Sequence, residues 1–471
     1  MKAFFDLPAK DTFAMPSVRF VHAADLHLDT AFPGLARDVS PDLARELRDA
    51  TFTALERLVA LCEEERPDFL VLAGDIYNHE DLSLRAQIAV RDACERLGRL
   101  GIPVFLAHGN HDPLSSRLGS LRWPDNVTVF GSTAEAVPVY RPGYGDEVLA
   151  VVHGVSHVGP RETRNLAAWF HRSPHVCPQI GVLHATLGSA DGEARYAPCT
   201  VDDLAASGLD YWALGHIHEH GMVCREPLAV YPGSLQGLHI GEQGPRGCVL
   251  VTLEGGEENG AQGVNNADVA AVRASYEFRP LAPVGWQIVD VNLERSALEA
   301  AEAPGVENGD ADAPDDLGRV ERLVRTRLDA ASAALWPGCR TLVVRVRLTG
   351  RTPLDAELRR LSVRNELCDA LQEGFGGADV RLWIKDVEVD TRPEFDRAAA
   401  VQREDLLGEV LRRADAWRAD GGLLTAGVDA ALSDLFSRGR GRKGLSEPRA
   451  EELASLLDEA ERLCADLLEN N

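Results

Sequence analysis

The sequence predicts a mixed α/β protein with a parallel sheet, followed by a smaller α+β unit and a helical tail. The first observation is the order strand–helix–strand–helix–strand over residues 17–107, which favours a parallel sheet with right-handed crossovers. The second is that short strands predominate from there to about residue 281. The third is the helical spacing of apolar residues beyond Pro393. A chain of 471 residues is too long for one core.

The elements of the parallel sheet are predicted from apolar segments that each end at a short polar turn. Strands are expected over residues 17–24, 68–73 and 102–107. Helices over residues 41–65 and 81–100 connect them. The first helix is expected to begin at a serine followed by proline, a pair that suits the N-cap and the first helical position.

The later elements follow from the same patterns. Thr200 followed by Asp203 predicts a helix start by a capping box. Strands are expected at residues 127–130, 137–140, 148–153, 179–184, 211–214, 223–225, 247–253, 276–281, 287–293, 340–348 and 379–389, and two late helices at 317–335 and 353–372. The predicted parts are an N-terminal extension (1–17), a large α/β domain (18–283), an α+β domain (284–395) with an acidic linker (300–316), and a helical region (396–471).

Composition restricts the class of protein and its substrate. With 45% hydrophobic and 26% charged residues, and no apolar run of about 20 residues, the chain is expected to be soluble and outside the membrane. None of the nine cysteines forms a CxxC pair, which favours a reduced, cytoplasmic location. The net charge of −25 disfavours nucleic-acid binding, although bound metal ions would supply local positive charge.

Residue types that bind metals recur directly after the predicted strands. The pattern comprises Asp25-Leu26-His27, Gly74-Asp75, Gly109-Asn110-His111-Asp112, His184 and Gly215-His216-Ile217-His218. Each motif alone is also compatible with a helix cap, a turn or a buried histidine. Because the carboxyl ends of parallel strands meet at one edge of a sheet, the motifs together predict a shared site.

In this order, the five motifs closely resemble the calcineurin-like metallophosphoesterase superfamily over about residues 18–253. The resemblance implies a four-layer α/β/β/α sandwich, with the α+β domain as a cap over the active site. It also implies two divalent ions, one held by Asp25, His27, Asp75 and His218, and the other by Asp75, Asn110, His184 and His216. Asp75 would bridge the two ions. Mixed nitrogen and oxygen ligands suit manganese, iron or zinc better than magnesium, and the resemblance favours manganese.

Two residues of the third motif are candidates for catalysis. His111 would stabilise the phosphate charge or protonate the leaving oxygen. Asp112 would orient that imidazole.

Other segments resemble bacterial DNA-repair exonucleases of the SbcD and YhaO type. They are residues 102–108, residues 74–78, and residues 231–237, which contain Ser234. Ser234 and His79 are candidate substrate-binding residues, although a turn and a surface histidine are the plainer interpretations. Four arginines of the α+β domain would contact phosphates or form a solvated strand face: Arg340, Arg345, Arg347 and Arg351.

Three functions remain open from the sequence. The first is a manganese-dependent DNA nuclease acting from 3′ ends, and on single strands as an endonuclease, in DNA repair. The second is a phosphoesterase for small nucleotides or phosphoproteins, which the charge of −25 favours. The third is a regulatory or DNA-binding subunit of a coiled-coil ATPase. The resemblance implies such an ATPase partner and a homodimer. The apolar residues at helical spacing in the C-terminal helices would either dock the partner or pack onto the chain's own core.

Overall fold

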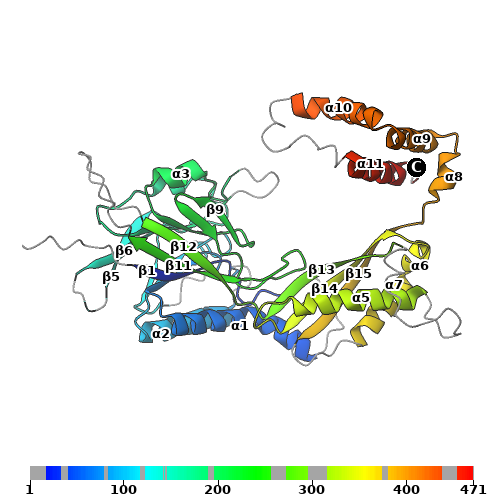
Figure 1. Cartoon of the computed structure of the whole chain (residues 1–471). Coiled ribbons are helices and arrows are strands. Elements are labelled where there is room, and N and C mark those ends of the chain that lie inside the picture. The colour runs from blue at the N-terminus through cyan, green and yellow to red at the C-terminus, as the bar shows by residue number, and fades with distance from the viewer. Residues whose placement is uncertain are drawn as a thin grey trace, which may run out of the picture. The chain divides into compact units, whose positions relative to one another are not determined.

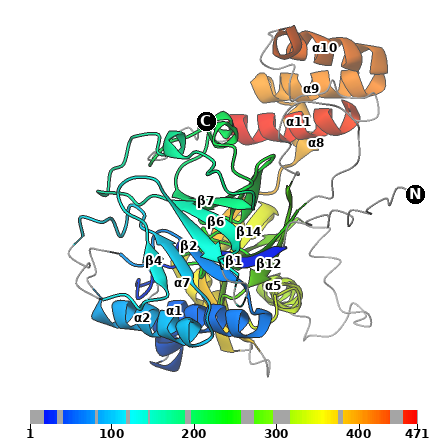
Figure 2. The same cartoon turned by 90° about the vertical axis from the view of Figure 1, so that its left-hand side faces the viewer.

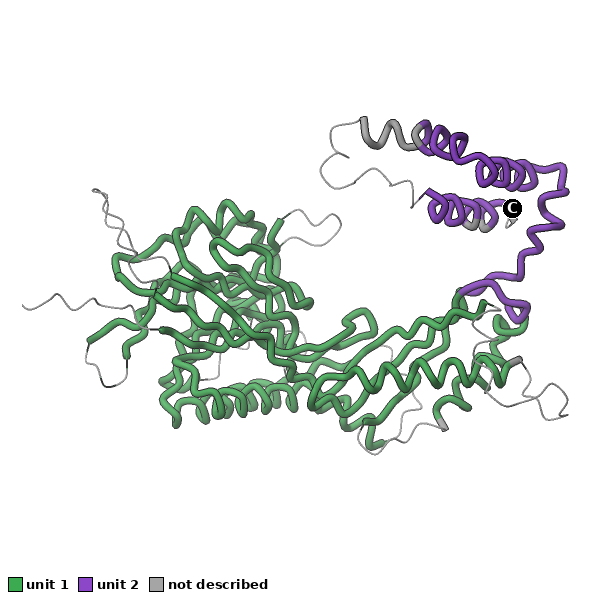
Figure 3. Tube along the Cα trace, in the orientation of Figure 1, with its two compact units in different colours: residues 1–349, 357–390 green, residues 350–356, 391–471 purple. Residues whose placement is uncertain are grey.

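The computed structural model describes residues 17–32, 41–78, 83–116, 122–141, 143, 146–188, 196–255, 272–294, 316–373, 380–437 and 453–469. The chain divides into two compact units, the first of residues 1–349 and 357–390, the second of residues 350–356 and 391–471 (Figure 3). The predicted N-terminal extension and acidic linker lie outside the described residues, except for Ser17 and Asp316.

The first sheet contains the predicted parallel strands. Its order is β12-β11-β1-β2-β3-β4, in which β1 to β4 run parallel and β11 pairs antiparallel with β1 and with β12. The strands are β1 (Val18–Ala23), β2 (Phe69–Ala73), β3 (Val104–Ala107), β4 (Val127–Val129), β11 (Gly247–Gly255) and β12 (Val272–Pro280). The three central parallel strands are almost wholly apolar because both of their faces are covered.

The second sheet has the order β5-β6-β7-β8-β10-β9. Its inner strands run parallel and its two edge strands pair antiparallel. The strands are β5 (Glu135–Tyr140), β6 (Val148–Gly154), β7 (Gln179–His184), β8 (Tyr211–Gly215), β9 (Gly221–Arg225) and β10 (Leu228–Tyr231).

The two sheets pack face to face, with helices on both outer faces (Figures 1 and 2). Phe20, Phe69 and Phe105 lie in the core between the sheets. Helices α1 (Pro41–Glu65) and α2 (Leu84–Arg99) cover the outer face of the first sheet. Helix α3 (Val201–Ala206), which begins with the predicted capping box, and the 3-10 helix η1 (Ala167–Trp169) cover the second. The four-layer α/β/β/α sandwich is confirmed.

A third sheet of order β13-β14-β15 and its helices form the α+β part of the chain, which belongs to the first unit except for residues 350–356 and 391–392. Its elements are β13 (Val284–Asn292), β14 (Thr341–Arg351), β15 (Arg381–Arg392), α5 (Asp316–Ala333), α6 (Asp355–Leu358) and α7 (Leu361–Glu373). Leu43 and Leu47 of α1 pack against Trp286 and Val343 of this sheet. The long first helix therefore contacts both the first and the third sheets.

The second unit is helical, as predicted. It contains α8 (Arg397–Val401), α9 (Leu406–Ala419), α10 (Gly421–Ser437) and α11 (Leu453–Glu469). Leu407 and Leu411 pack with Ala465 in its apolar interior. Arg397 bonds Asp415 and Glu461, with nitrogen–oxygen distances of 2.5 Å, and so ties α8 to α9 and α11.

Two elements differ from the sequence prediction. Strand β10 was not expected, because its four residues are too short to show a period. The single helix predicted over residues 353–372 is instead α6 and α7, separated by a turn at residues 359–360. Both separating residues are arginines, which favour helices, so composition gives no sign of the break.

The cysteines and the apolar character of the helices were compared with the sequence predictions. None of the nine cysteines, all of which lie in described ranges, forms a disulfide. Within the described part of the chain, no helix combines the length and the apolar character that crossing a bilayer requires.

Candidate metal centre

The predicted metal ligands meet at one edge of the paired sheets. Each lies at the carboxyl end of a strand, His184 as the last residue of β7 and the others in the loops after β1, β2, β3 or β8. Backbone hydrogen bonds join the first two loops, from the Asp25 amide to the Gly74 carbonyl at 3.0 Å and from the His27 amide to the Asp75 carbonyl at 3.1 Å. The structure thus brings together all seven residues predicted from the sequence, namely Asp25, His27, Asp75, Asn110, His184, His216 and His218.

The ligand atoms form two clusters. In the first, one ligand atom each of Asp25, His27 and His218 lies within 4.8 Å of the other two. In the second, the same holds for Asp75, His184 and His216. Asn110 extends the second cluster, since its Oδ1 lies 3.0 Å from His184 Nε2.

Asp75 lies between the two clusters. Its Oδ2 atom is 3.2 Å from His184 Nε2 and 3.9 Å from His27 Nε2, so one oxygen faces a ligand nitrogen of each cluster. The side chain is 1% exposed. A carboxylate at this position can contact a cation in each cluster.

Three of the four histidines are held by the ring nitrogen that faces away from the centre. His27 Nδ1 lies 2.9 Å from Asn78 Oδ1, His184 Nδ1 lies 3.0 Å from the Ala73 carbonyl, and His218 Nδ1 lies 2.6 Å from Glu242 Oε1. An Nδ1–H that donates outward leaves the Nε2 lone pair for a cation. The donor set therefore suits two divalent ions with nitrogen and oxygen ligands.

Four of the seven residues have a left-handed backbone, which non-glycine residues rarely adopt. The φ angles are 50° at Asp25, 41° at His27, 51° at Asp75 and 104° at His216. Each such residue costs on the order of 1–3 kcal/mol, and such strain concentrates at functional sites. The packed sheets beneath hold these residues in conformations that their own preferences oppose.

Glycines in the motifs leave room for the ligands. A Cβ atom on Gly109 would lie 2.3 Å from Asp75 Oδ1, and one on Gly74 would lie 2.4 Å from His184 Nδ1. A Cβ atom on Gly215 would meet the Ala73 carbonyl oxygen at 1.9 Å. All three distances are shorter than non-bonded contacts allow, so these motifs require glycine.

The second cluster contains a coupled acid–base pair. Burial raises the pKa of Asp75. The charge of His184 and its hydrogen bond lower this pKa by more than burial raises it, so the net pKa is well below the ordinary value. Burial lowers the pKa of His184, but the Asp75 carboxylate raises it to about 9. A cation at His184 Nε2 competes with a proton there, so cation affinity should rise with pH.

The buried His27 and the half-buried His216 resist protonation. Burial lowers the pKa of His27 to about 4 and that of His216 to about 3. Both rings are neutral at pH 7, the form that binds metals. Burial also raises the pKa of Asp25 to about 6, although His184 and His218 oppose the shift.

The two catalytic candidates differ in their surroundings. His111 is exposed, and its ring meets the His27 ring edge-on with centroids 5.0 Å apart. Its backbone amide donates to Asp75 Oδ1 at 2.8 Å. Asp112 is buried and accepts backbone hydrogen bonds from Ile76 at 3.0 Å and Gly109 at 2.7 Å. These contacts let Asp112 hold two ligand loops together, a role not anticipated from the sequence.

Of the two substrate-binding candidates, the structure describes only Ser234. Ser234 is fully buried, and its amide donates to the His218 carbonyl at 3.0 Å. His79 lies outside the described residues. Arg345 pairs with Asp386 at 2.6 Å and Arg347 with Asp290 at 2.7 Å, so acids of the third sheet already neutralise these two arginines. That favours the solvated strand face.

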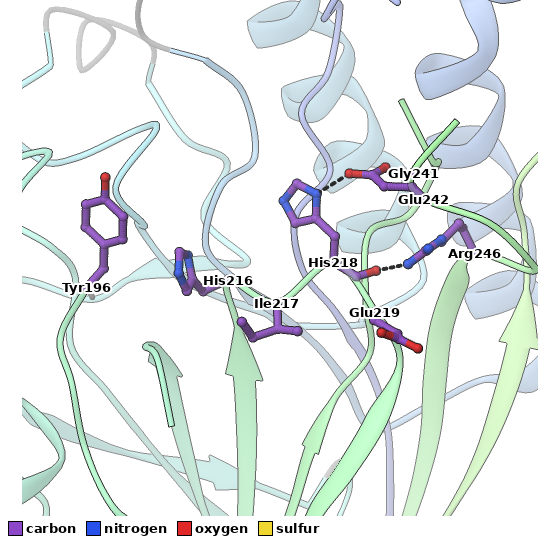
Figure 4. Close-up of a pocket in the computed structure, with 8 residues that line it drawn as sticks. All are labelled: Tyr196, His216, Ile217, His218, Glu219, Gly241, Glu242 and Arg246. Atoms are coloured by element: carbon purple, nitrogen blue, oxygen red, sulfur yellow. Dashed lines mark hydrogen bonds and ion pairs between the residues drawn. The ribbon is translucent and has the colours of Figure 1, made fainter. Parts of the chain in front are cut away.

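A cavity of about 410 Å³ opens beside the two histidines of the GHxH motif (Figure 4). Glu242 and Arg246 line it on the side of His218, and Tyr196 lines it beyond His216. The Tyr196 and His216 rings lie edge-to-face with centroids 5.2 Å apart. Glu242 and Tyr196 were missed by the sequence analysis, because neither belongs to a motif or follows a predicted strand.

Residues 18–220 match the family model described as calcineurin-like phosphoesterase. The chain carries a calcineurin-like phosphoesterase domain. Residues 308–392 match the middle domain of metallophosphoesterase YhaO, a segment that includes β14 and β15 of the third sheet. This phosphoesterase domain thus contains all seven ligand positions, and a YhaO-type middle domain follows it.

The chain resembles curated relatives over part of their length. It is 36% identical over 291 residues to the uncharacterized metallophosphoesterase YhaO of Bacillus subtilis (strain 168), which covers 61% of this chain and 65% of the relative. It is 31% identical over 255 residues to the DNA double-strand break repair protein Mre11 of Aeropyrum pernix, which covers 51% of this chain and 59% of the relative. The chain therefore spans less than two thirds of the length of these relatives. A dimetal phosphatase from Danio rerio aligns at 13% identity and a TM-score of 0.30, over 50% of this chain and 95% of that one.

Proposed function

We propose that this metallophosphoesterase is a dinuclear-metal-dependent nuclease that hydrolyses phosphodiester bonds in DNA. The observation that carries the proposal is the position of Asp75 Oδ2 between two clusters of ligand atoms. Two divalent cations, when bound by these two clusters, would supply Lewis acidity that polarises a phosphoryl group and acidifies a water molecule.

The side chains around the ions have separate tasks in this proposal. Asp75, His184 and their neighbours fix the ions, and Asp112 holds the Gly109 and Ile76 loops in register. His111 is an exposed imidazole whose ring packs edge-on against His27 of the first cluster. It would stabilise charge on the phosphate or give a proton to the leaving oxygen.

DNA is the proposed substrate because matched relatives are named as DNA double-strand break repair proteins. Within that class we propose 3′-to-5′ exonuclease activity and cleavage of single strands, in DNA repair, with manganese as the metal. A large coiled-coil ATPase is the proposed partner, with the C-terminal helices as its dock and a homodimer as the working form. The unpaired cysteines support a cytoplasmic location.

A phosphoesterase for small nucleotides or phosphoproteins is the second candidate. The net charge of −25 favours it, because that field repels a long polyanion far more than a small ester.

One assay separates the two candidates. The purified chain is incubated with Mn²⁺ and with end-labelled duplex DNA, single-stranded DNA or bis(p-nitrophenyl) phosphate. We expect cleavage of both DNA and the small ester, with His111→Ala retaining its metals but losing about 100-fold or more in rate. Cleavage of the small ester alone would favour the second candidate, and cleavage of neither by a chain that holds two ions would leave only a regulatory role.

A further inference from the structure

One loop holds the metal-ligand candidate His218 at two points. This loop, residues 232–246, connects β10 to β11. Glu242 Oε1 accepts from the ring at Nδ1 at 2.6 Å. The carbonyl of His218 accepts from the Arg246 guanidinium (Figure 4). It also accepts from the Ser234 amide. Ring and backbone are therefore fixed by the same short segment.

Glu242 is itself held in place. Its side chain is 9% exposed, and its other carboxylate oxygen, Oε2, accepts from the Leu238 amide at 2.7 Å. One oxygen thus orients the carboxylate within the loop while the other meets His218. An imidazole that donates from Nδ1 in this way presents its Nε2 lone pair, which here lies 3.1 Å from His27 Nε2 and 3.9 Å from Asp25 Oδ1.

The same loop is bonded along β13 of the third sheet. The Trp286 indole donates to the Gly237 carbonyl at 2.8 Å. The side-chain amide of Gln236 donates from Nε2 to the backbone carbonyl of Val284 at 2.9 Å, and its Oε1 accepts from the backbone amide of Val284 at 3.2 Å. Gln243 Oε1 accepts from the Ile288 amide at 2.9 Å. The loop is therefore a continuous link between the third sheet and one ligand.

The ligands of the second cluster are held from elsewhere, whereas Asp25 of the first cluster also contacts this loop, since its carbonyl accepts from the Leu235 amide at 3.4 Å. His184 is held by the carbonyl of Ala73 in the sheet core, and His27 by Asn78 of the neighbouring ligand loop. Among the histidines of the centre, His218 is the one whose ring and carbonyl contacts come from the loop bonded to β13.

We propose that Glu242 is a positioning residue for His218, and that the loop at residues 232–246 makes the affinity of the first ion depend on how β13 holds that loop. The proposal rests on the metal-dependent function proposed above. In this proposal, the YhaO-type middle domain and the strand β13 that precedes it influence the ion affinity of the first cluster and not that of the second.

The test measures metal binding, which does not require turnover. Mn²⁺ titrations by calorimetry and metal analysis would be performed on the full chain and on Glu242→Ala, Glu242→Gln and Glu219→Gln. Glu219 lines the same cavity, so its variant is the matched control. We expect Glu242→Ala to weaken one ion by about 10–100-fold and leave the other unchanged. Glu242→Gln, whose amide oxygen still accepts a hydrogen bond, should recover part of that loss.

The link to the third sheet is tested by Trp286→Phe, with Trp336→Phe as its control. Both changes delete an indole–carbonyl hydrogen bond, but the acceptor of Trp286 is Gly237 of the loop, whereas the acceptor of Trp336 is Ala282, outside the loop. We expect Trp286→Phe to weaken one ion several-fold, and Trp336→Phe to weaken neither. Equal losses of both ions in Glu242→Ala, or equal effects of the two tryptophan changes, would overturn the proposal.

Failure of the proposed function gives a different pattern. A wild-type chain that binds two ions but cleaves no phosphodiester would reject the nuclease, while the selective effect of Glu242→Ala would still stand. A wild-type chain that hydrolyses DNA, with both ions unaffected in Glu242→Ala, would reject the positioning role alone.

Discussion

The two ligand clusters differ in what holds them. The second cluster is supported by the sheets, since His184 is fully buried and bonded to the Ala73 carbonyl. The first is supported by side chains from loops: Asn78 holds His27, and Glu242 holds His218, whose side chain is 31% exposed. A backbone carbonyl of the packed core holds a histidine of the second cluster, and loop side chains hold two histidines of the first. The difference implies that the two ions respond separately to mutation, with Asp75 as their common element.

The largest effect is expected from Asp75→Asn, which removes the charge shared by both clusters. An amide oxygen bridges two cations poorly, and the partner of the buried His184 is weakened at the same time. Binding of both ions should fall by more than about 100-fold, and hydrolysis should vanish with it. Metal analysis after dialysis measures this directly. Retention of two ions per chain would show that Asp75 is not shared.

Gly109→Ala should abolish ion binding at the second cluster and weaken ion binding at the first cluster less. The added Cβ lies 2.3 Å from Asp75 Oδ1 and 2.8 Å from His184 Nε2. Overpacking of this kind costs about 1–3 kcal/mol and displaces the second cluster. Gly159→Ala is the control, because a Cβ there meets open space. Mn²⁺ titration and thermal unfolding report the two effects, and wild-type affinity at the second site would contradict the geometry.

A third prediction concerns His22, which supports the sheet side of the centre. Its ring lies between the sheets, 3.1 Å from the carbonyl of Leu214, just before the GHxH motif. Burial lowers its pKa to about 3 from an unfolded value of 6.5. The neutral folded form therefore contributes stability above pH 6.5, and this contribution is lost as the pH falls from 6.5 towards 3.

When the pH falls from 7 to 5, protonation of His22 in the unfolded chain should lower the free energy of unfolding by about 2 kcal/mol. Urea unfolding of the wild type and His22→Gln at both pH values measures it. We expect the variant to show a smaller drop in the free energy of unfolding over this range. An identical drop in both proteins would assign the acid sensitivity to other groups.

The smallest effect is expected from Asn78→Ala on the loop-supported side. It removes the acceptor that orients His27, so the first ion should bind about tenfold more weakly while the second is unchanged. Asn78→Asp keeps an acceptor at that position and should retain most of the affinity. Mn²⁺ titration distinguishes the variants, and equal weakening of both ions would remove the distinction between the clusters.

Much of this arrangement could be predicted from the sequence, for a physical reason. Asp25 and Asp75 follow the apolar strands β1 and β2, and His184 is the last residue of the apolar strand β7. Parallel strands bring such ends to one edge of a sheet. The convergence of the seven residues was therefore predictable, while their binding of metals stays a prediction.

The supporting contacts could not be predicted. Glu242 lies 24 residues beyond His218 in a loop with no periodic pattern. The bonds from Asp112 to two backbone amides depend on how the loops pack, and the short strand β10 shows no repeat of its own. Long-range loop contacts of this kind are set by tertiary packing, which local sequence patterns do not encode.

The central claim is that one carboxylate is shared by two cations. Crystals soaked in Mn²⁺ and measured at the manganese absorption edge test it most directly. We expect two anomalous peaks roughly 3.5–4 Å apart, with Asp75 between them and the Nε2 atoms of His27 and His184 on opposite sides. A single peak, or an Asp75 side chain bound to one ion and turned away from the other, would contradict the account.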